Sequence, residues 1–380
     1  MKVLHIMLAC FYIDNYNYQE NILPRIHKEL GHSVKIIAST ETFIDNNILG
    51  YMEPGEYVNE DGIEVVRLPY KNALLNIVTR KRRKYVGLMQ EILNFRPDVI
   101  MCHGIQFKDL DVVIEYKKNN PNIKVYADSH EDEFNSASSW ISKYMLHKLY
   151  YGRIIKKNYK RIDKIFCVSK SSIDFMHDMY NIPYSLLEFL PLGGIIDNDT
   201  VYSRKRIKYR QEFNLKDDDI VFCHSGKMTK EKKTKELVET FCSTKYKKFK
   251  LLLIGNIIDN SDFILKYIEQ DDRIQFLGWR NGKELNEILA ASDVYVQPGT
   301  QSATMQTAAC MRNCMMLYPY ENHKYIFKTH ALYISDQNDM EAVFNNIGEG
   351  KINLEKLREA SYEIAREKLD YYKIAKRVLK

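Results

Sequence analysis

Short apolar runs alternate with amphipathic segments along the amino-terminal half of the chain. The runs lie at residues 3–9, 33–38, 63–68, 99–102, 124–127 and 165–168. Between them, segments such as Asn17–Leu30 place Ile22, Ile26 and Leu30 at helical spacing, and a further helix is expected over Arg80–Leu93. Strands that alternate with helices in this way predict a parallel sheet covered by helices on both faces.

A second series of the same kind begins near Ile220. Its predicted strands are 220–223, 251–254, 274–277, 294–297 and 315–317. The segment 193–219 between the two series is polar and includes a charged helix over 205–213, and the tail after residue 354 is amphipathic. Because 380 residues are more than one hydrophobic core usually serves, we expect an α/β protein with two doubly wound domains and a linker near Asp197.

Composition and charge narrow the class of protein only slightly. The net charge of +6 is compatible with an anionic substrate or an anionic membrane surface. The seven cysteines are scattered and lack the spacing of a zinc site, which is typical of a reduced, cytoplasmic protein. No apolar run reaches the length of a membrane helix.

The stretch Val221–Phe241, VFCHSGKMTKEKKTKELVETF, is typical of a strand, a loop and a helix. Gly226 lets the backbone approach a ligand closely, and the start of a helix presents unpaired N–H groups. Lys227 and Lys232 add positive charge beside them. This is a candidate anion site that suits a diphosphate, although an ordinary strand–loop–helix unit with a solvated lysine run has the same pattern.

Several motifs in this chain, taken in order, resemble those of glycosyltransferase family 4. Gly226-Lys227-Met228, Lys232 and Phe241 match the family pattern G-R-L-x-x-x-K-G-x-x-x-L-x-x-A-F without a gap. The motifs LLIG (252–255), FLGW (276–279), EL (284–285) and ASDVYVQP (291–298) follow in the family's order. Weaker matches in the first half are GHSV (31–34), RPDVI (96–100) and PLGG (191–194).

The resemblance implies the GT-B architecture, in which two Rossmann-like domains face each other across a cleft. Residues 1–197 would form the acceptor-side domain and residues 198–361 the donor-binding domain, with a final helix at about 362–380 packed back on the first. The implied reaction transfers a sugar, with retention, from a nucleotide-diphosphate donor to a hydroxyl of a glycan or polyprenyl-linked acceptor. Capsule, O-antigen or exopolysaccharide synthesis is the expected setting.

The implied donor site lies at the carboxyl ends of the second series of strands. Lys227 and Lys232 take the places where the family uses Arg and Lys to hold the diphosphate, and their charge would stabilise the leaving phosphate without a metal. Gly278 and Trp279 correspond to the loop that meets the nucleotide base, although Trp279 could instead be a packed aromatic. We expect a UDP-linked donor.

The segment 298–316, PGTQSATMQTAACMRNCMM, lacks the two glutamates that the family usually carries here. Alignment of its end places Thr307 at the ribose-binding glutamate. Ser302 suits a helix N-cap, and the helix start that follows Ala303 offers N–H groups to phosphate. The neutral residues Gln301, Ser302, Thr304 and Thr307 could replace the carboxylates. The alternative is a catalytically silent subunit that binds nucleotide or a partner transferase; a nucleotide-sugar epimerase is a third reading.

In the first domain the loop after 124–127, DSHEDEFNS, combines a histidine with several carboxylates. Family members often carry a functional histidine in this loop, so His130 is the candidate catalytic residue. Asp128 and the acidic residues Glu131–Glu133 could orient the acceptor hydroxyl, or could form an acidic turn that caps a helix. His103, after the preceding strand, is a second histidine candidate.

The first strand is followed by CFYIDNYNYQEN, which contains no glycine and therefore argues against an NAD-binding motif. Tyr18 and Gln19 would line the acceptor side, or would only cap and solvate the first helix. Basic and aromatic residues interleave at 80–85 and 143–161. Such stretches suit either an anionic inner membrane surface or a core-facing helix with a solvated face, and we expect no nucleic acid partner.

Overall fold

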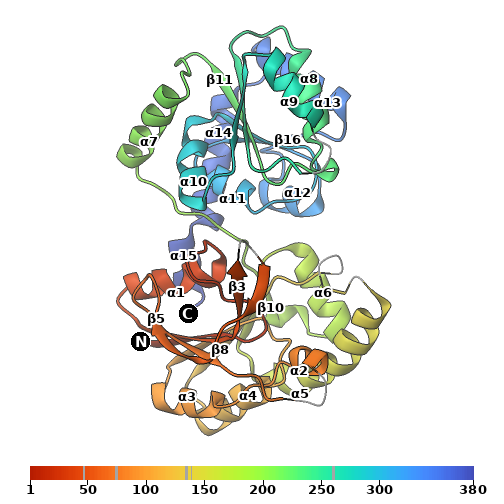
Figure 1. The fold of residues 1–380 in the computed structure, drawn as a ribbon. Helices are drawn as coiled ribbons and strands as arrows, with labels where there is room; N and C mark the ends of the chain where they lie inside the picture. Colours follow the sequence, from red (N-terminus) through yellow and green to blue (C-terminus); the bar gives the residue numbers. More distant parts are fainter. Residues whose placement is uncertain (46–47, 73–75, 133–135, 138, 259–261) are drawn as a thin grey trace. The chain divides into compact units, whose positions relative to one another are not determined.

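The computed structural model describes residues 1–45, 48–72, 76–132, 136–137, 139–258 and 262–380 (Figure 1). The chain forms two compact units, Met1–Pro191 with Tyr372–Lys380, and Leu192–Tyr371. The crossing at Pro191 comes a few residues before the linker expected near Asp197. Only Tyr372–Lys380, and not the whole of 362–380, belongs with the first unit.

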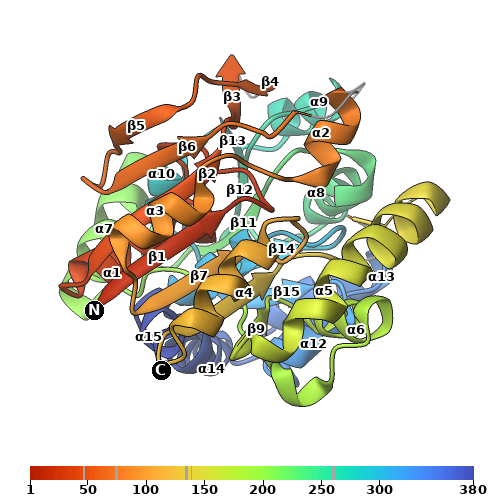
Figure 2. The same ribbon diagram turned by 90° about the horizontal axis from the view of Figure 1, so that it is seen from below.

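The first unit is built on an eight-stranded sheet in the order β10-β9-β8-β7-β1-β2-β6-β5 (Figure 2). Its strands are β1 (Lys2–Met7), β2 (Ser33–Ser39), β5 (Gly55–Val58), β6 (Glu64–Leu68), β7 (Val99–His103), β8 (Lys124–Ser129), β9 (Lys164–Cys167) and β10 (Leu187–Phe189). Neighbouring strands are parallel except for β5 and β6. The predicted parallel sheet is therefore confirmed, while β5, β10 and the antiparallel pair β3 (Glu41–Asp45) and β4 (Ile48–Tyr51) were not anticipated.

The helices of this unit are α1 (Gln19–Glu29), α2 (Asn76–Arg82), α3 (Leu88–Phe95), α4 (Leu110–Asn119), a π-helix (Ile141–Tyr151), α5 (Gly152–Asn158), α6 (Lys170–Tyr180) and α15 (Tyr371–Arg377). The single helix expected over Arg80–Leu93 is wrong: α2 ends at Arg82, and α3 starts after Gly87. Arg83 and Gly87 both have positive φ angles, 48° and 94°, which no α-helix contains.

The second unit contains a six-stranded parallel sheet in the order β13-β12-β11-β14-β15-β16. Its strands are β11 (Ile220–Ser225), β12 (Phe249–Ile254), β13 (Ile274–Gly278), β14 (Val294–Gln297), β15 (Cys314–Leu317) and β16 (Leu332–Tyr333). Its helices are α7 (Asp199–Glu212), α8 (Thr234–Cys242), α9 (Asp262–Gln270), α10 (Gly282–Ala291), α11 (Thr304–Cys310), α12 (Glu321–Phe327), α13 (Gln337–Gly348) and α14 (Leu354–Ile364). All five predicted strands are present, and β16 adds an edge.

Asp293 connects α7 to the amino ends of β11 and β14 in the second unit. Its carboxylate accepts a hydrogen bond from the Val221 N–H at 2.9 Å and lies 2.7 Å from Arg206 and 3.4 Å from Arg210, both on α7. The aspartate of the ASDVYVQP motif is therefore structural. Beneath it, Phe222 packs edge-to-face against Phe344 at 5.0 Å in a fully buried core.

The carboxyl-terminal segment is divided between the two units. α14 packs on β15 in the second unit. α15 contacts the first unit, where Tyr372 donates a hydrogen bond to Glu29, and Arg377 pairs with Glu188. No helix in the described part of the chain is both long and apolar enough to cross a membrane.

Candidate functional site

Three loops at the carboxyl ends of β11, β12 and β14 pack backbone against backbone. Gly226 and Gly255 have φ angles of +130° and +138°, and a Cβ on Gly255 would lie 1.9 Å from the Gly226 carbonyl oxygen. A Cβ on Gly299 would lie 2.1 Å from the Glu231 carbonyl oxygen. Only glycine fits at Gly255 and Gly299, so these residues hold the segment 226–232 tightly in place.

Lys232 is buried where these loops meet, with 9% of its surface exposed. Its ammonium donates a hydrogen bond to the Thr300 carbonyl at 3.3 Å. Burial lowers the pKa of Lys232, and among the described residues no carboxylate compensates its charge. A buried cation without a counter-ion is unfavourable unless a ligand brings negative charge, so Lys232 is the best-supported anion-binding group in this unit.

The remaining lysines of the same loop differ in their surroundings. Lys227 is exposed at the carboxyl end of β11, as expected for a residue that meets a ligand. Lys233 is instead engaged with the Ser335 carbonyl at 3.2 Å and the Tyr318 ring at 4.8 Å. The expected helix start lies farther from Gly226 than the sequence pattern indicated, because a short helical turn at 230–232 comes before α8.

The predicted donor-binding segment 301–307 leads into α11. Ser302 was expected to be the N-cap, but Ala303 occupies that position, and the Ser302 hydroxyl accepts a hydrogen bond from the Thr304 N–H at 3.3 Å. Gln301 accepts a hydrogen bond from Asn322 at 3.1 Å. Thr307 faces the start of the second unit, since a Cβ on Gly194 would lie 3.3 Å from the Thr307 Cα.

Several buried acceptor atoms lie in or near this segment, and the segment 298–316 contains no glutamate. Three acceptor atoms are buried and have no hydrogen-bond partner among the residues that the structure describes: Gln297 Oε1, Gln306 Oε1 and His323 Nε2. The Gln297 amide donates to the Thr300 carbonyl at 2.9 Å, the same oxygen that Lys232 contacts. Buried acceptors normally have donors, so a ligand that donates hydrogen bonds would suit these atoms.

His323 was missed by the sequence analysis because no motif marks it. Its Nδ1 donates to the Tyr318 carbonyl at 2.7 Å, so in the neutral ring Nε2 carries a lone pair. Burial lowers the pKa of His323, and the nearby Lys232 charge lowers it further. Its one signal in the sequence was its place just after β15, where the structure has helix α12 (Glu321–Phe327).

The predicted base-binding loop follows β13. Gly278 has a φ angle of +68°, and its carbonyl accepts a hydrogen bond from the Gly255 N–H at 2.8 Å. Trp279 is 64% exposed, so it is not the packed aromatic that was the alternative.

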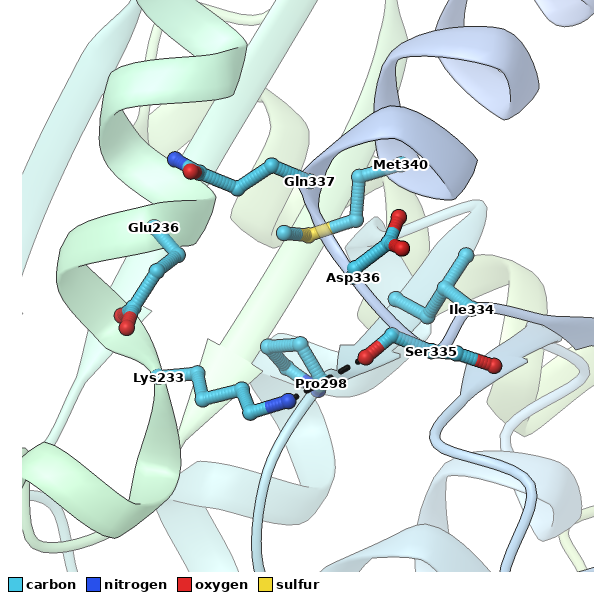
Figure 3. A pocket seen from close by; sticks show the side chains of 8 residues that line it. All are labelled: Lys233, Glu236, Pro298, Ile334, Ser335, Asp336, Gln337 and Met340. Atoms are coloured by element: carbon cyan, nitrogen blue, oxygen red, sulfur yellow. Dashed lines mark hydrogen bonds between the residues drawn. The ribbon is translucent and has the colours of Figure 1, made fainter.

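A cavity of about 170 Å³ lies beside these loops, between the starts of α8 and α13 (Figure 3). It is lined by Lys233, Glu236, Pro298, Ile334, Ser335, Asp336, Gln337 and Met340. Figure 3 shows the Lys233 side chain extending towards the Ser335 carbonyl at its edge. None of the predicted donor-binding residues lines this cavity, and we do not assign the donor to it.

In the first unit, Asp128 at the end of β8 is the centre of a buried polar cluster. Its Oδ2 lies 2.7 Å from His103 Nδ1, 3.4 Å from Gln19 Nε2 and 3.9 Å from His130 Nε2. Its Oδ1 accepts a hydrogen bond from the Gly104 N–H at 3.1 Å. The structure thus brings together four of the predicted first-domain residues.

Burial separates these residues into two groups. Gln19, His103 and Asp128 are at most 2% exposed, so they do not offer an acceptor the direct contact that was expected of them. The His130 side chain is 33% exposed and Tyr18 is 49% exposed. The His130 and Tyr18 side chains are therefore accessible, while Asp128 lies 3.9 Å from His130 Nε2 and is itself contacted by His103 and Gln19.

Glu131 lies apart from this cluster and is partly buried, with 20% of its side chain exposed. Burial raises the pKa of its carboxyl to about 7, against the opposing charge of Arg83. Glu131 Oε2 lies 3.8 Å from His147 Nδ1, which also contacts the Tyr180 hydroxyl at 2.7 Å. Glu133, named with it above, lies outside the described residues.

The comparisons with known sequences agree with the second unit. Residues 205–304 match the family model described as glycosyl transferases group 1, which includes the segment from Gly226 to Lys232. The O-antigen biosynthesis glycosyltransferase WclY of Escherichia coli is 25% identical over 226 residues, which are 59% of this chain. The match spans 60% of the length of that relative.

Solved structures resemble the whole chain. HepE of Anabaena in complex with UDP has a TM-score of 0.67 and 14% identity, over 100% of this chain and 98% of its own. A glycosyltransferase from Rickettsia africae has a TM-score of 0.66 and 12% identity, and the match covers 99% of this chain and 96% of that protein. WaaG, a glycosyltransferase involved in lipopolysaccharide biosynthesis, has a TM-score of 0.63 and 14% identity, and the match covers 99% of this chain and 98% of WaaG.

These likenesses confirm the predicted fold: the chain is a GT-B protein. Within that class, its second unit carries a glycosyl transferases group 1 segment. Membership of family 4 in particular stays a prediction.

Proposed function

We propose that this protein is a glycosyltransferase that moves a sugar from a nucleotide-diphosphate donor to a hydroxyl of a glycan or polyprenyl-linked acceptor. The observation that carries the proposal is Lys232, a buried cation without a described counter-ion where the ends of three parallel strands meet. This place lies inside the segment that matches glycosyl transferases group 1. The expected setting is synthesis of a bacterial surface polysaccharide, as in the O-antigen relative.

The donor diphosphate would bind between Lys232 and the exposed Lys227. As the acceptor oxygen bonds to the anomeric carbon, the bond from that carbon to the phosphate oxygen breaks, and negative charge grows on the phosphate. Fixed positive charge stabilises that state more than the ground state, so both lysines lower the barrier without a metal. The hydroxyl proton leaves with the departing phosphate, which fits front-face attack with retention.

Hydroxyls of the ribose and the sugar would donate to the buried acceptors Gln297, Gln306 and His323. These neutral atoms take the place of the two carboxylates that family 4 usually supplies. Neutral acceptors hold hydroxyls without adding negative charge beside the diphosphate. The UDP bound to HepE makes UDP-linked sugars the first donors to test.

For the first unit we assign the acceptor contact to His130. Its partly exposed imidazole is the one that a hydroxyl can reach, and Asp128 lies 3.9 Å from its Nε2. A carboxylate behind an imidazole orients the ring and favours its N–H toward the carboxylate. Asp128, His103 and Gln19 are then positioning residues.

Contact with an anionic membrane surface is part of the same proposal. Exposed apolar side chains gather at the start of the π-helix, where Trp140 is 68%, Ile141 69% and Met145 52% exposed. Lysines and arginines follow from 143 to 161, and this stretch contains no acidic residue. Apolar residues beside positive charge suit a bilayer of anionic lipids, where a lipid-linked acceptor would lie.

Vesicle co-sedimentation tests the membrane contact. We expect binding to vesicles that contain phosphatidylglycerol and little binding to pure phosphatidylcholine. The double variant Trp140→Ser, Ile141→Ser should weaken binding, whereas Tyr184→Ser, which removes an exposed aromatic elsewhere in the unit, should not. Equal binding of the double variant and wild type would refute this contact.

Thermal stability in the presence of nucleotides tests the donor site. A ligand that binds only the folded protein raises its melting temperature. We expect a shift with UDP or a UDP-sugar, compared with GDP and ADP, that is reduced in Lys227→Ala. If no nucleotide at millimolar concentration raises the melting temperature, the donor-site assignment is wrong.

A catalytically silent GT-B subunit is the second candidate, favoured by the absence of both family glutamates from 298–316. It would show the nucleotide shift and no sugar transfer with any acceptor. An epimerase would instead convert the free donor without acceptor. Transfer of radiolabelled sugar to a lipid-linked acceptor separates the proposed function from both.

A further inference from the structure

Three buried histidines form one hydrogen-bonded row in the first unit. His27 Nδ1 lies 2.9 Å from His5 Nε2, and His5 Nδ1 lies 2.9 Å from His103 Nε2. The row begins at the Ala375 carbonyl of α15, 2.9 Å from His27 Nε2, and ends at Asp128, 2.7 Å from His103 Nδ1. All three rings are at most 1% exposed.

The two ends of the row determine where its protons lie. A carbonyl oxygen only accepts, so His27 Nε2 must carry a proton, and the Nδ1 of neutral His27 must accept. His5 then donates from Nε2 and accepts at Nδ1, which requires a proton on His103 Nε2. The row contains four hydrogen bonds, and three neutral imidazoles supply only three protons. The fourth proton must lie between His103 Nδ1 and Asp128.

The surroundings of Asp128 favour placing that proton on His103. The carboxylate also accepts from the Gly104 N–H, and the Gln19 amide lies 3.4 Å away, contacts that stabilise its charged form. Burial opposes a charge on His103, but Asp128 outweighs burial and raises the pKa of His103. The pKa of Asp128 is lowered, with His103 as the main favourable partner against burial.

The other two rings remain neutral. Burial lowers the pKa of His5 well below its usual range and that of His27 to about 4. The further titratable groups that face the row are Glu20, Cys10, Cys102 and Cys167 near its His103–Asp128 end, His130 beside Asp128, and His32 beside His27. Burial raises the pKa of the three thiols, so they add no charge at neutral pH.

We propose that His27, His5 and His103 act as a positioning relay, which holds His103 as an imidazolium paired with ionised Asp128 and thereby fixes that carboxylate beneath His130. The far end of the relay is a backbone carbonyl of α15, so docking of the carboxyl-terminal helix supports the charge state next to His130. The consequence for catalysis rests on the proposed function. The protonation pattern does not, because it rests on the hydrogen bonds of the row, the burial of its rings and the surroundings of Asp128.

Nitrogen NMR of the full-length protein with ¹⁵N-labelled histidine tests the protonation pattern directly. At pH 7.5 we expect His103 to have both nitrogens protonated, and the other two histidines of the row, His5 and His27, to be neutral and protonated at Nε2. Loss of the imidazolium signal in His103→Gln would assign it. A neutral His103 at pH 7.5, or one that titrates like a free histidine, would overturn the relay.

The variant His5→Leu cuts the relay in the middle and removes the acceptor of His103 Nε2. We expect His103 to lose its proton at lower pH than in wild type, and kcat for sugar transfer to fall roughly 10- to 100-fold with little change in KM for the donor. The matched control is His32→Gln, since His32 lies 6.3 Å from His27, ring centre to ring centre, but outside the row. It should leave both the His103 signal and kcat unchanged.

The outcomes separate the two proposals. If His5→Leu alters neither the His103 titration nor kcat, the relay is wrong. If wild type transfers no sugar to any acceptor, the proposed function fails, and the NMR titration still decides the relay. Should His5→Leu not fold, the wild-type titration alone decides whether His103 is held as an imidazolium.

Discussion

The backbone of Gly255 touches that of Gly226 so closely that no side chain fits between them: an ideal Cβ on Gly255 would lie 1.9 Å from the Gly226 carbonyl oxygen. The contact joins the loops after β11 and β12. It also fixes the path of the chain to Lys232, whose Cε would lie 3.3 Å from a Cβ on Gly226. The glycines of the GKM and LLIG motifs therefore work as a pair that shapes the proposed diphosphate site.

Gly255→Ala should displace the Gly226 loop. We expect a loss of about 2 kcal/mol in the free energy of unfolding, because a side chain is forced into a packed site at a positive φ angle. The UDP-induced rise in melting temperature should also disappear. Gly350→Ala is the control, since Gly350 has a φ angle of +70° and open space around its Cβ position. Normal UDP binding by Gly255→Ala would contradict the role of the glycine pair.

Lys232→Met should make the nucleotide-free protein more stable while it weakens nucleotide binding. The lowered pKa of Lys232 means that the unfolded chain holds this proton more tightly than the folded protein does. Stability of wild type therefore rises with pH once the folded-state lysine begins to lose its proton, and the rise ends near about pH 10.5, where the unfolded chain loses its own. The gain from Lys232→Met should be largest at neutral pH and vanish toward that pH.

Melting curves with and without UDP at pH 7 to 10 measure both effects. Each kcal/mol should raise the melting temperature by roughly 2–4 °C. Lys227→Ala serves as the control for stability, because its exposed ammonium carries no burial penalty. Reduced stability in Lys232→Met would mean that this ammonium has a structural partner, and Lys232 would no longer qualify as an anion-binding group.

Comparison with Glu131→Gln should show that the Glu131 carboxyl lowers the free energy of unfolding of wild type as pH rises. The folded protein holds the Glu131 proton up to about pH 7, while the unfolded chain releases it near 4.5. Between these values the folded state binds more protons, so this group lowers stability as pH rises. The variant should match wild type below about pH 4.5 and exceed it by at most about 3 kcal/mol at pH 8.

Urea unfolding at several pH values gives this comparison. Glu284→Gln on α10 is a useful reference, because Glu284 only completes an exposed capping box. A constant difference between Glu131→Gln and wild type from pH 4 to 8 would show that the carboxyl titrates normally.

The sequence predicted most of the sheet because buried parallel strands leave continuous apolar runs. It did not predict β5 and β10 at the sheet edges, where side chains are partly exposed and the apolar signal is weak. The helix break at Arg83 was also invisible, since arginine normally favours helix. Positive φ there depends on tertiary contacts, among them the Arg83 hydrogen bond to the Gln106 carbonyl at 3.0 Å.

The candidate sites were predictable to a lesser degree. Gly226, Lys227 and Lys232 lie in one motif, so their proximity could be inferred from the sequence. His5, His27 and His323 could not be selected, because a lone histidine in an apolar strand or helix has no distinctive pattern. Their importance comes from contacts between residues far apart in the chain, such as His27 and Ala375.

Asp293→Asn tests the interpretation that the aspartate of the ASDVYVQP motif is structural. The side chain is 9% exposed, and its charge faces Arg206 and Arg210 while it accepts from the Val221 N–H. Loss of the charge leaves a nearly buried arginine unpaired, and we expect the free energy of unfolding, measured in urea, to fall by about 3 kcal/mol.

Asp199→Asn is the matched control, because Asp199 also pairs with an arginine, Arg312, but its side chain is 89% exposed. The control should change stability by less than about 1 kcal/mol. UDP should still raise the melting temperature of the folded Asp293→Asn protein. If that rise is lost while stability is unchanged, Asp293 contributes to the nucleotide site and is not purely structural.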